Sequence, residues 1–74
     1  MIELRVWLKN SREKLGLTQN EMSEKLNIAQ GYYSMIESGE RQKSLDLSLV
    51  TKLSEILGVT VDFIVENEKQ IEKR

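Results

Sequence analysis

The sequence predicts an all-α domain built from five short helices. Apolar residues recur at helical spacing over most of the 74 residues. There is no proline to break a helix from within. Gly16, Gly39 and Gly58 each follow a helical pattern, where a left-handed residue ends a helix at little cost. A chain of this length forms one domain, so we expect short connections and mostly local contacts.

The composition excludes several classes of protein. There is no Cys and no His, which argues against disulfides, zinc fingers and thiol or imidazole catalysis. No apolar run is long enough to span a membrane, and no signal-peptide core is evident, so we expect a cytoplasmic protein without a membrane partner. The formal net charge is −1. Because a local basic cluster can still meet phosphates, this charge neither supports nor excludes a nucleic-acid partner.

The first helix is predicted over residues 2–15, ending at Gly16. Its expected inner face consists of Leu4, Leu8, Ser11 and Leu15. Charged residues are expected off that face: Arg5, Lys9, Arg12 and Glu13.

The next two helices are separated by a tight turn. Thr18 and Glu21 match a capping box that starts the second helix, and Asn27 ends it in the left-handed region. Met22 and Leu26 are expected to face inward. The third helix runs from Ala29, which supplies no side-chain cap, to Ser38, with Tyr33 and Ile36 inward.

The last two helices follow a polar loop over residues 40–45. Asp46 is a good N-cap for the fourth helix, which is expected to end at Gly58 and is marked by Leu47, Val50, Leu53, Ile56 and Leu57. Thr60 is the expected cap of the fifth helix, whose apolar residues are Val61, Phe63, Ile64 and Val65.

From Gln19 to Gly39 the sequence resembles the Cro/phage-repressor type of helix-turn-helix, the XRE family, and the resemblance covers roughly residues 4–66. It is carried by three stretches in the right order: LKNSREKLGLTQNEMSEKLNIAQ (8–30), IESGER (36–41) and LSEILGVTVDFI (53–64). Family members typically show RxxxGLTQxxLAxxLGVSQ, IExGxR and LGVxxDxL there. The resemblance implies a lambda-repressor-like domain over residues 1–67. Residues 68–74 form a charged tail that either extends the last helix or is disordered.

The family's geometry implies that the third helix lies in the major groove of double-stranded DNA. The base-reading candidates are Gln30, Gly31, Tyr32, Ser34 and Met35. Gln30 leads because its amide can pair bidentately with adenine. Gly31 fits either a close approach to DNA or a tolerated glycine. The phosphate candidates are Gln19, Ser38, Arg41 and Lys43. The alternatives are a solvated polar side chain at Gln30, a half-buried surface aromatic at Tyr32, a packing residue at Met35, an ordinary helix-start residue at Gln19 and solvated loop charges at Arg41 and Lys43.

Three further residue sets follow from the resemblance. Arg12 and Glu37 occupy positions that pair between the first and third helices, so we expect a partly buried structural salt bridge. Phe63, Ile64 and Val65 are candidates for a homodimer interface, although they can instead complete the monomer core. Tyr33 stands where Val or Ile is usual, so we expect looser packing there or a hydroxyl that reaches the surface.

The leading hypothesis is a sequence-specific transcriptional regulator, repressor-like, acting as a homodimer on a palindromic operator. The alternative is a protein-interaction module or an antitoxin-type protein of the same fold with weak or secondary DNA binding. An enzyme is the poorest hypothesis, because there is no glycine-rich phosphate loop and no convincing carboxylate pair. No cofactor, metal or small-molecule ligand is expected.

Overall fold

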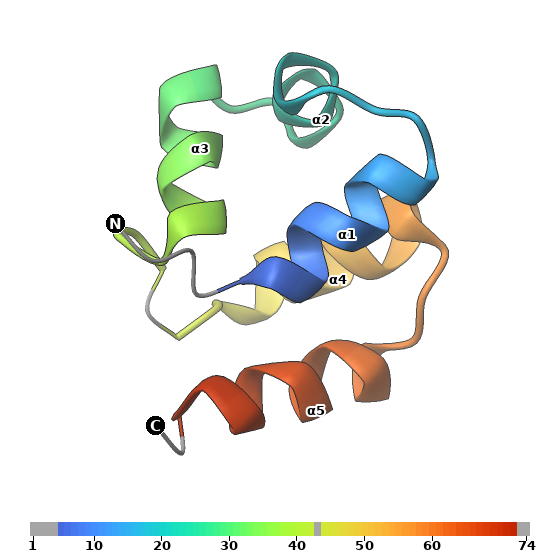
Figure 1. Ribbon diagram of the computed structural model, residues 1–74, viewed down its shortest axis with the longest axis vertical. Coiled ribbons are helices and arrows are strands. Elements are labelled where there is room, and N and C mark those ends of the chain that lie inside the picture. Colours follow the sequence, from blue (N-terminus) through green and yellow to red (C-terminus); the bar gives the residue numbers. More distant parts are fainter. Residues whose placement is uncertain (1–4, 43, 73–74) are drawn as a thin grey trace.

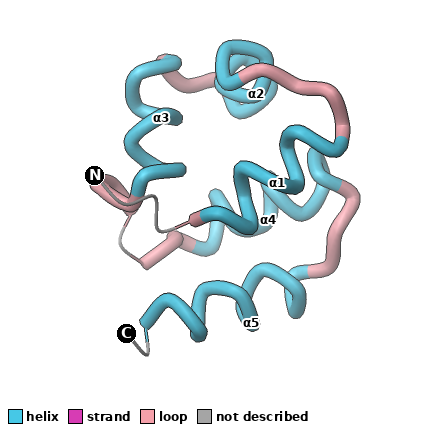
Figure 2. The backbone as a smooth tube through the Cα atoms, viewed as in Figure 1, coloured by secondary structure: helices cyan, strands magenta, loops and turns pink. Residues whose placement is uncertain are grey.

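The computed structural model describes residues 5–42 and 44–72. Within these ranges it has no strand and five helices, shown in Figures 1 and 2: α1 (Val6–Lys14), α2 (Gln19–Leu26), α3 (Gln30–Ser38), α4 (Leu47–Leu57) and α5 (Val61–Glu72). The prediction of a five-helix all-α fold is therefore confirmed. The helix α5 continues past residue 67, so the start of the charged tail is helical.

The helix ends follow the local signals in the sequence. The Thr18 hydroxyl accepts from the Glu21 N–H at 3.1 Å, and the Glu21 carboxylate accepts from the Thr18 N–H at 2.9 Å, which completes the capping box of α2. The Asp46 carboxylate caps α4 by accepting from the Leu49 N–H at 2.8 Å. Asn27 ends α2 with a φ of +59°, in the left-handed region that asparagine tolerates. These caps fix where α2 and α4 begin and end.

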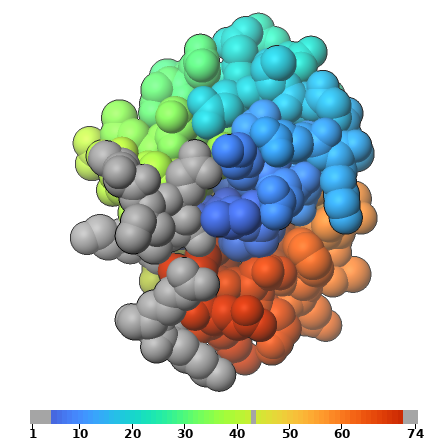
Figure 3. Space-filling model, viewed as in Figure 1, coloured from blue at the N-terminus to red at the C-terminus, as the bar shows by residue number. Residues whose placement is uncertain are grey.

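The helices pack around a single core. In Figure 1, α2 and α3 lie at one end of the molecule and α5 at the other, with α1 and α4 between them. Figure 3 shows the surface of α1 filling the space between α2 and α5 on one face. The buried apolar residues come from all five helices: Leu8, Met22, Leu26, Tyr33, Ile36, Leu49, Val50, Leu53, Leu57 and Ile64. α3 is thus held by side chains on α1, α2 and α4.

Several predictions for the faces of α1 are wrong. Arg5 and Arg12, expected off the inner face of α1, are both buried. Leu15, expected on the inner face, is half exposed because α1 ends at Lys14 and Leu15 is its C-cap residue. Leu47 begins α4 as expected, and its side chain is 78% exposed. The predicted start of α1 at residue 2, and with it Leu4, lies outside the described residues.

Within the part of the chain that the structure describes, no helix is both long enough and apolar enough to cross a membrane.

Candidate nucleic-acid interface

The helix pair α2–α3 is joined by a turn of three residues, 27–29. Ser23 is buried where the chain enters this turn, and its backbone carbonyl accepts from the Ile28 N–H at 3.0 Å. Ala29 precedes α3 without a side-chain cap bond. Because Met22, Leu26, Tyr33 and Ile36 all lie in the core, the two helices are fixed at one crossing angle.

Glu37 of α3 lies at the centre of a buried polar cluster. It is 2% exposed, and its carboxylate accepts from the Nε of Arg12 at 2.6 Å. The Arg12 guanidinium also donates from Nη1 to the Leu17 carbonyl at 2.7 Å. The Gln19 amide donates to Glu37 at 3.0 Å. The cluster joins α1, the start of α2 and α3. It contains the Arg12–Glu37 pair that the resemblance implies.

The Tyr33 hydroxyl completes this cluster by donating to Glu37 Oε2 at 2.6 Å. Tyr33 is fully buried, so the expectation of looser packing or a surface hydroxyl is wrong. Burial raises the pKa of Tyr33, and the hydrogen bond to Glu37 raises it further. The pKa of Arg12 is raised mainly by its hydrogen bond to Glu37. Both groups therefore keep their protons throughout the neutral range.

Because the pKa of Tyr33 is raised in the folded state, its contribution to stability is present below the ordinary tyrosine pKa of 10.0. That contribution is lost as the pH rises above 10.0 towards the folded-state pKa, since the unfolded chain gives up the proton first. We expect the unfolding free energy of the native chain to fall above pH 10, and to fall less steeply in Tyr33→Phe.

Urea unfolding between pH 8 and pH 11 measures this difference. Tyr32→Phe is the matched control, because it removes a neighbouring hydroxyl that is only partly buried and leaves Tyr33 in place. If the unfolding free energy falls equally steeply above pH 10 in the native chain and in Tyr33→Phe, the pKa of Tyr33 is not raised in the folded state.

Of the base-reading candidates, Gln30, Gly31, Ser34 and Met35 lie on the side of α3 that faces away from the core, whereas the Tyr32 ring packs against the core. Gln30 and Gly31 are exposed, whereas Tyr32, Ser34 and Met35 are partly buried. A Cβ added at Gly31 would meet no atom within 4 Å, so the packing of the chain itself does not require glycine there. The first turn of α3 therefore offers an exposed amide beside an open backbone surface.

The phosphate candidates that the structure describes differ in their exposure and in the groups beside them. Arg41 is exposed in the loop after α3. The Gln19 amide is partly engaged by Glu37, as described above. The Ser38 hydroxyl lies 3.1 Å from the Met35 carbonyl and 3.0 Å from the Glu40 carboxylate, which places a negative charge beside it. Lys43 lies outside the described residues. Among the described candidates, Arg41 therefore supplies an exposed positive charge.

The three dimer candidates do not share one environment. Phe63 and Val65 are 42% and 39% exposed, whereas Ile64 is fully buried in the core. Phe63 meets the Trp7 ring edge-on, with the ring centroids 6.1 Å apart. Since Ile64 packs inside its own chain, only Phe63 and Val65 leave side-chain surface for a partner.

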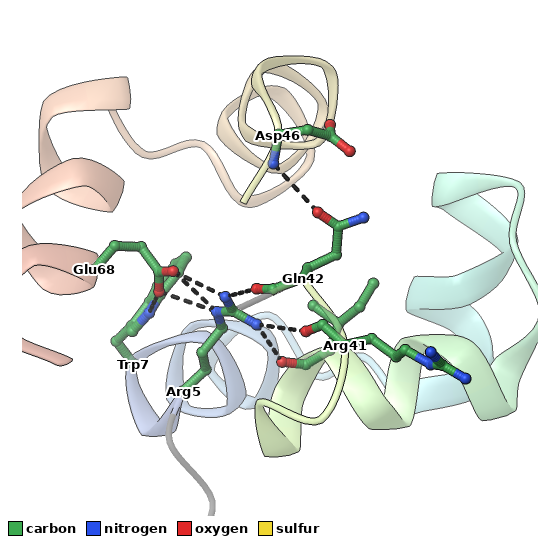
Figure 4. A network of polar contacts seen from close by, with 7 residues as sticks. Arg5, Trp7, Arg41, Gln42, Asp46 and Glu68 are labelled. Atoms are coloured by element: carbon green, nitrogen blue, oxygen red, sulfur yellow. Dashed lines mark hydrogen bonds and ion pairs between the residues drawn. The ribbon is translucent and has the colours of Figure 1, made fainter. Parts of the chain in front are cut away.

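Sequence reasoning missed the cluster around Arg5, which Figure 4 shows. The Arg5 guanidinium donates from Nε to both Glu68 carboxylate oxygens, at 3.0 and 3.1 Å, and from Nη1 to the carbonyls of Ile36 at 2.7 Å and Arg41 at 3.2 Å. From Nη2 it donates to the Gln42 carbonyl. The Trp7 indole donates to Glu68 at 2.8 Å. Arg5 thus ties the C-terminal end of α3 and the following loop to α5.

Among residues 5–42 and 44–72 no group of three or more His, Cys, Asp or Glu side chains is placed to hold a metal ion.

The family model described as helix-turn-helix matches residues 8–64, which include α2 and α3. The chain is 42% identical over 55 residues to the uncharacterized HTH-type transcriptional regulator YqaF of Bacillus subtilis, covering 74% of this chain and 70% of YqaF. It is 36% identical over 66 residues to the HTH-type transcriptional regulator ImmR of the same organism, covering 89% of this chain and 50% of ImmR.

A third relative is the SPbeta prophage-derived uncharacterized HTH-type transcriptional regulator YonR of Bacillus subtilis, 39% identical over 59 residues. That match covers 80% of this chain, and the chain spans about half the length of YonR and ImmR (53% and 50%). No solved structure matches the chain significantly. The family match covers most of the chain and contains the α2–α3 unit, so the protein belongs to the XRE-type helix-turn-helix family.

Proposed function

We propose that the protein is a sequence-specific DNA-binding transcriptional regulator in which α3 is the recognition helix. The observation that carries this proposal is the contrast between the two sides of α3. One side is fixed in the core through Tyr33, Ile36 and the buried Glu37, while Gln30 and Gly31 at its start are exposed. A rigid helix with a free N-terminal turn is what major-groove recognition requires. The three relatives described above are all HTH-type transcriptional regulators, which supports the same function.

In this proposal Gln30 pairs with an adenine edge, and Gly31 lets the backbone of α3 approach the groove. Tyr32, Ser34 and Met35 contact the groove further along. Arg41, Lys43 and the Gln19 amide meet phosphates. Ser38 is the weakest of these contacts, because Glu40 lies beside its hydroxyl.

We further propose a cytoplasmic homodimer that occupies a palindromic operator and acts as a repressor. One α3 covers a single half-site, so two-fold pairing doubles the number of DNA contacts. The exposed Phe63 and Val65 of α5 are the side chains we assign to the subunit interface. The phosphate contacts available to each subunit are few, which makes pairing more important for affinity. The proposal involves no cofactor and no small-molecule ligand.

Gln30→Ala is expected to remove discrimination at one or two base pairs. A bidentate amide–adenine pair contributes about 1–3 kcal/mol of discrimination, which corresponds to roughly 5- to 150-fold in relative affinity. The measurement is the dissociation constant for the duplex that the native protein selects from a random pool, and for its single-base variants. Gln70→Ala is the control, because Gln70 is exposed on α5. An unchanged pattern of preferences in Gln30→Ala would contradict the base-reading role.

The Glu40 carboxylate, which lies beside the phosphate candidate Ser38, favours a second candidate, a protein-interaction or antitoxin-type module of the same fold. The experiments on DNA separate the two. The second candidate predicts a stable complex with another protein. It also predicts no salt-dependent binding to any duplex at low ionic strength.

A further inference from the structure

Gln42, in the loop after α3, makes hydrogen bonds with both ends of its side-chain amide. Its Oε1 accepts from the Asp46 N–H at 3.3 Å, and its Nε2 donates to the Tyr32 hydroxyl oxygen at 2.8 Å. The Asp46 N–H is a backbone donor, so the amide oxygen must face it and the amide nitrogen must face Tyr32. The Tyr32 oxygen is therefore an acceptor in this contact, and its own O–H proton is not used by Gln42.

The backbone of Gln42 is fixed as well. Its φ is +55°, in the left-handed region that a glutamine seldom adopts. Its carbonyl accepts from Nη2 of the buried Arg5, which also binds Glu68 of α5 (Figure 4). Contacts at both the backbone and the side chain therefore hold Gln42 in place and set the position of its amide.

The Tyr32 ring is held on its other side by apolar packing. It packs against the core and lines a surface hollow with Leu26, Ile28 and Leu49. Asp46 and Lys52 line the same hollow. The Asp46 carboxylate is engaged in capping α4, and Lys52 supplies a positive charge. Among the residues that the structure describes, none accepts the Tyr32 O–H proton, so this hydroxyl is an oriented donor beside a hollow that holds both a carboxylate and a cation.

From this geometry we infer that Gln42 is a positioning residue that aims the Tyr32 O–H at a phosphate oxygen of bound DNA. The inference rests on the proposed function, because it assumes that α3 enters the groove. Tyr32 is the third residue of α3, where a side chain at the edge of the groove meets the DNA backbone. A phosphate oxygen only accepts hydrogen bonds, so it complements a hydroxyl whose acceptor side is already occupied.

The test is a double-mutant cycle with Gln42→Gly and Tyr32→Phe. Gln42→Gly suits the positive φ and keeps the carbonyl that Arg5 binds, while it removes the side chain and with it the hydrogen bonds to Tyr32 and to the Asp46 N–H. Gln42→Asn is a second variant, since asparagine also tolerates this backbone and its amide is one methylene shorter. Gln70→Ala, on the exposed part of α5, is the control. Circular dichroism and thermal unfolding establish that every variant is folded.

The probe is the duplex that the native protein selects from a random-sequence pool. Each single variant is expected to weaken binding by about tenfold, and the double variant is expected to bind no more weakly than Tyr32→Phe alone. Replacing one contacted phosphate by a neutral methylphosphonate should weaken binding by the native chain and leave binding by Tyr32→Phe unchanged.

Three results would overturn the inference. The first is an equal loss from Gln42→Gly in the native and Tyr32→Phe backgrounds, which would mean that Gln42 acts independently of Tyr32. The second is native-level binding by both Gln42→Gly and Tyr32→Phe. The third is a contact that depends on a base: Tyr32→Phe would then change the response of binding to one base substitution and to no phosphate replacement. Failure of the proposed function looks different, because the native chain itself would then select no duplex.

Discussion

Glu37→Gln is expected to lower the free energy of unfolding by about 3–5 kcal/mol, because it removes the buried counter-charge of Arg12 and leaves the guanidinium with the more exposed Glu13 carboxylate at 4.0 Å. Three residues donate to the Glu37 carboxylate: Arg12 from Nε at 2.6 Å and Nη2 at 3.5 Å, Tyr33 from its hydroxyl at 2.6 Å, and Gln19 from Nε2 at 3.0 Å. A glutamine has the same shape but turns an NH₂ group towards one of those donors. A domain of 74 residues has a total stability of only about 4–11 kcal/mol. We therefore expect a large fraction of the variant to be unfolded at 37 °C.

Urea unfolding followed by far-UV circular dichroism measures this loss. Glu24→Gln is the matched control, because it makes the same substitution at an exposed position of α2. The control should change the unfolding free energy by less than about 0.5 kcal/mol. A loss below about 1 kcal/mol for Glu37→Gln would mean that the cluster is screened by solvent and does not fix α3.

Arg5→Ala is the second substitution with a large expected effect, about 3–5 kcal/mol. It removes the partner of Glu68 and the donor to the carbonyls of Ile36, Arg41 and Gln42. Arg5→Lys should recover only part of the loss, because one ammonium cannot span the carboxylate on α5 and the carbonyls after α3.

Trp7 makes this second prediction easy to follow, since it is the single tryptophan and its indole donates to Glu68. We expect its fluorescence in Arg5→Ala to change at a lower urea concentration than in the native chain. Lys14→Ala, an exposed position on the same helix, is the control. If the urea midpoint of Arg5→Ala equals that of the native chain, the Arg5–Glu68 contact does not hold α5 in place.

The helix boundaries were largely predictable because their signals are local. The capping box spans only residues 18–21, and Asn27 adopts the left-handed conformation that its side chain tolerates. These interactions depend on residues three or four apart, so the sequence alone specifies them. Arg12 and Glu37 are 25 residues apart in the sequence, and only the family resemblance predicts that they pair.

The parts that sequence reasoning missed depend on residues far apart in the chain. Arg5 bonds to groups 31–63 residues away, and no spacing rule reveals such contacts. Other errors had a local signal. Tyr33 and Glu37 are four residues apart on one helix, which is the spacing of a side-chain pair. Phe63, Ile64 and Val65 are consecutive, and at about 100° per residue they point in three different directions around α5, so Ile64, which faces the core, cannot also face a partner.

Selection from a random duplex pool at low salt tests whether α3 reads DNA. We expect enrichment of a palindrome whose half-sites lie about 10 base pairs apart, centre to centre, and an affinity that falls as salt rises. Competition by the enriched duplex should exceed competition by a scrambled duplex at every salt concentration. If no sequence is enriched and the affinity does not respond to salt, α3 does not read DNA.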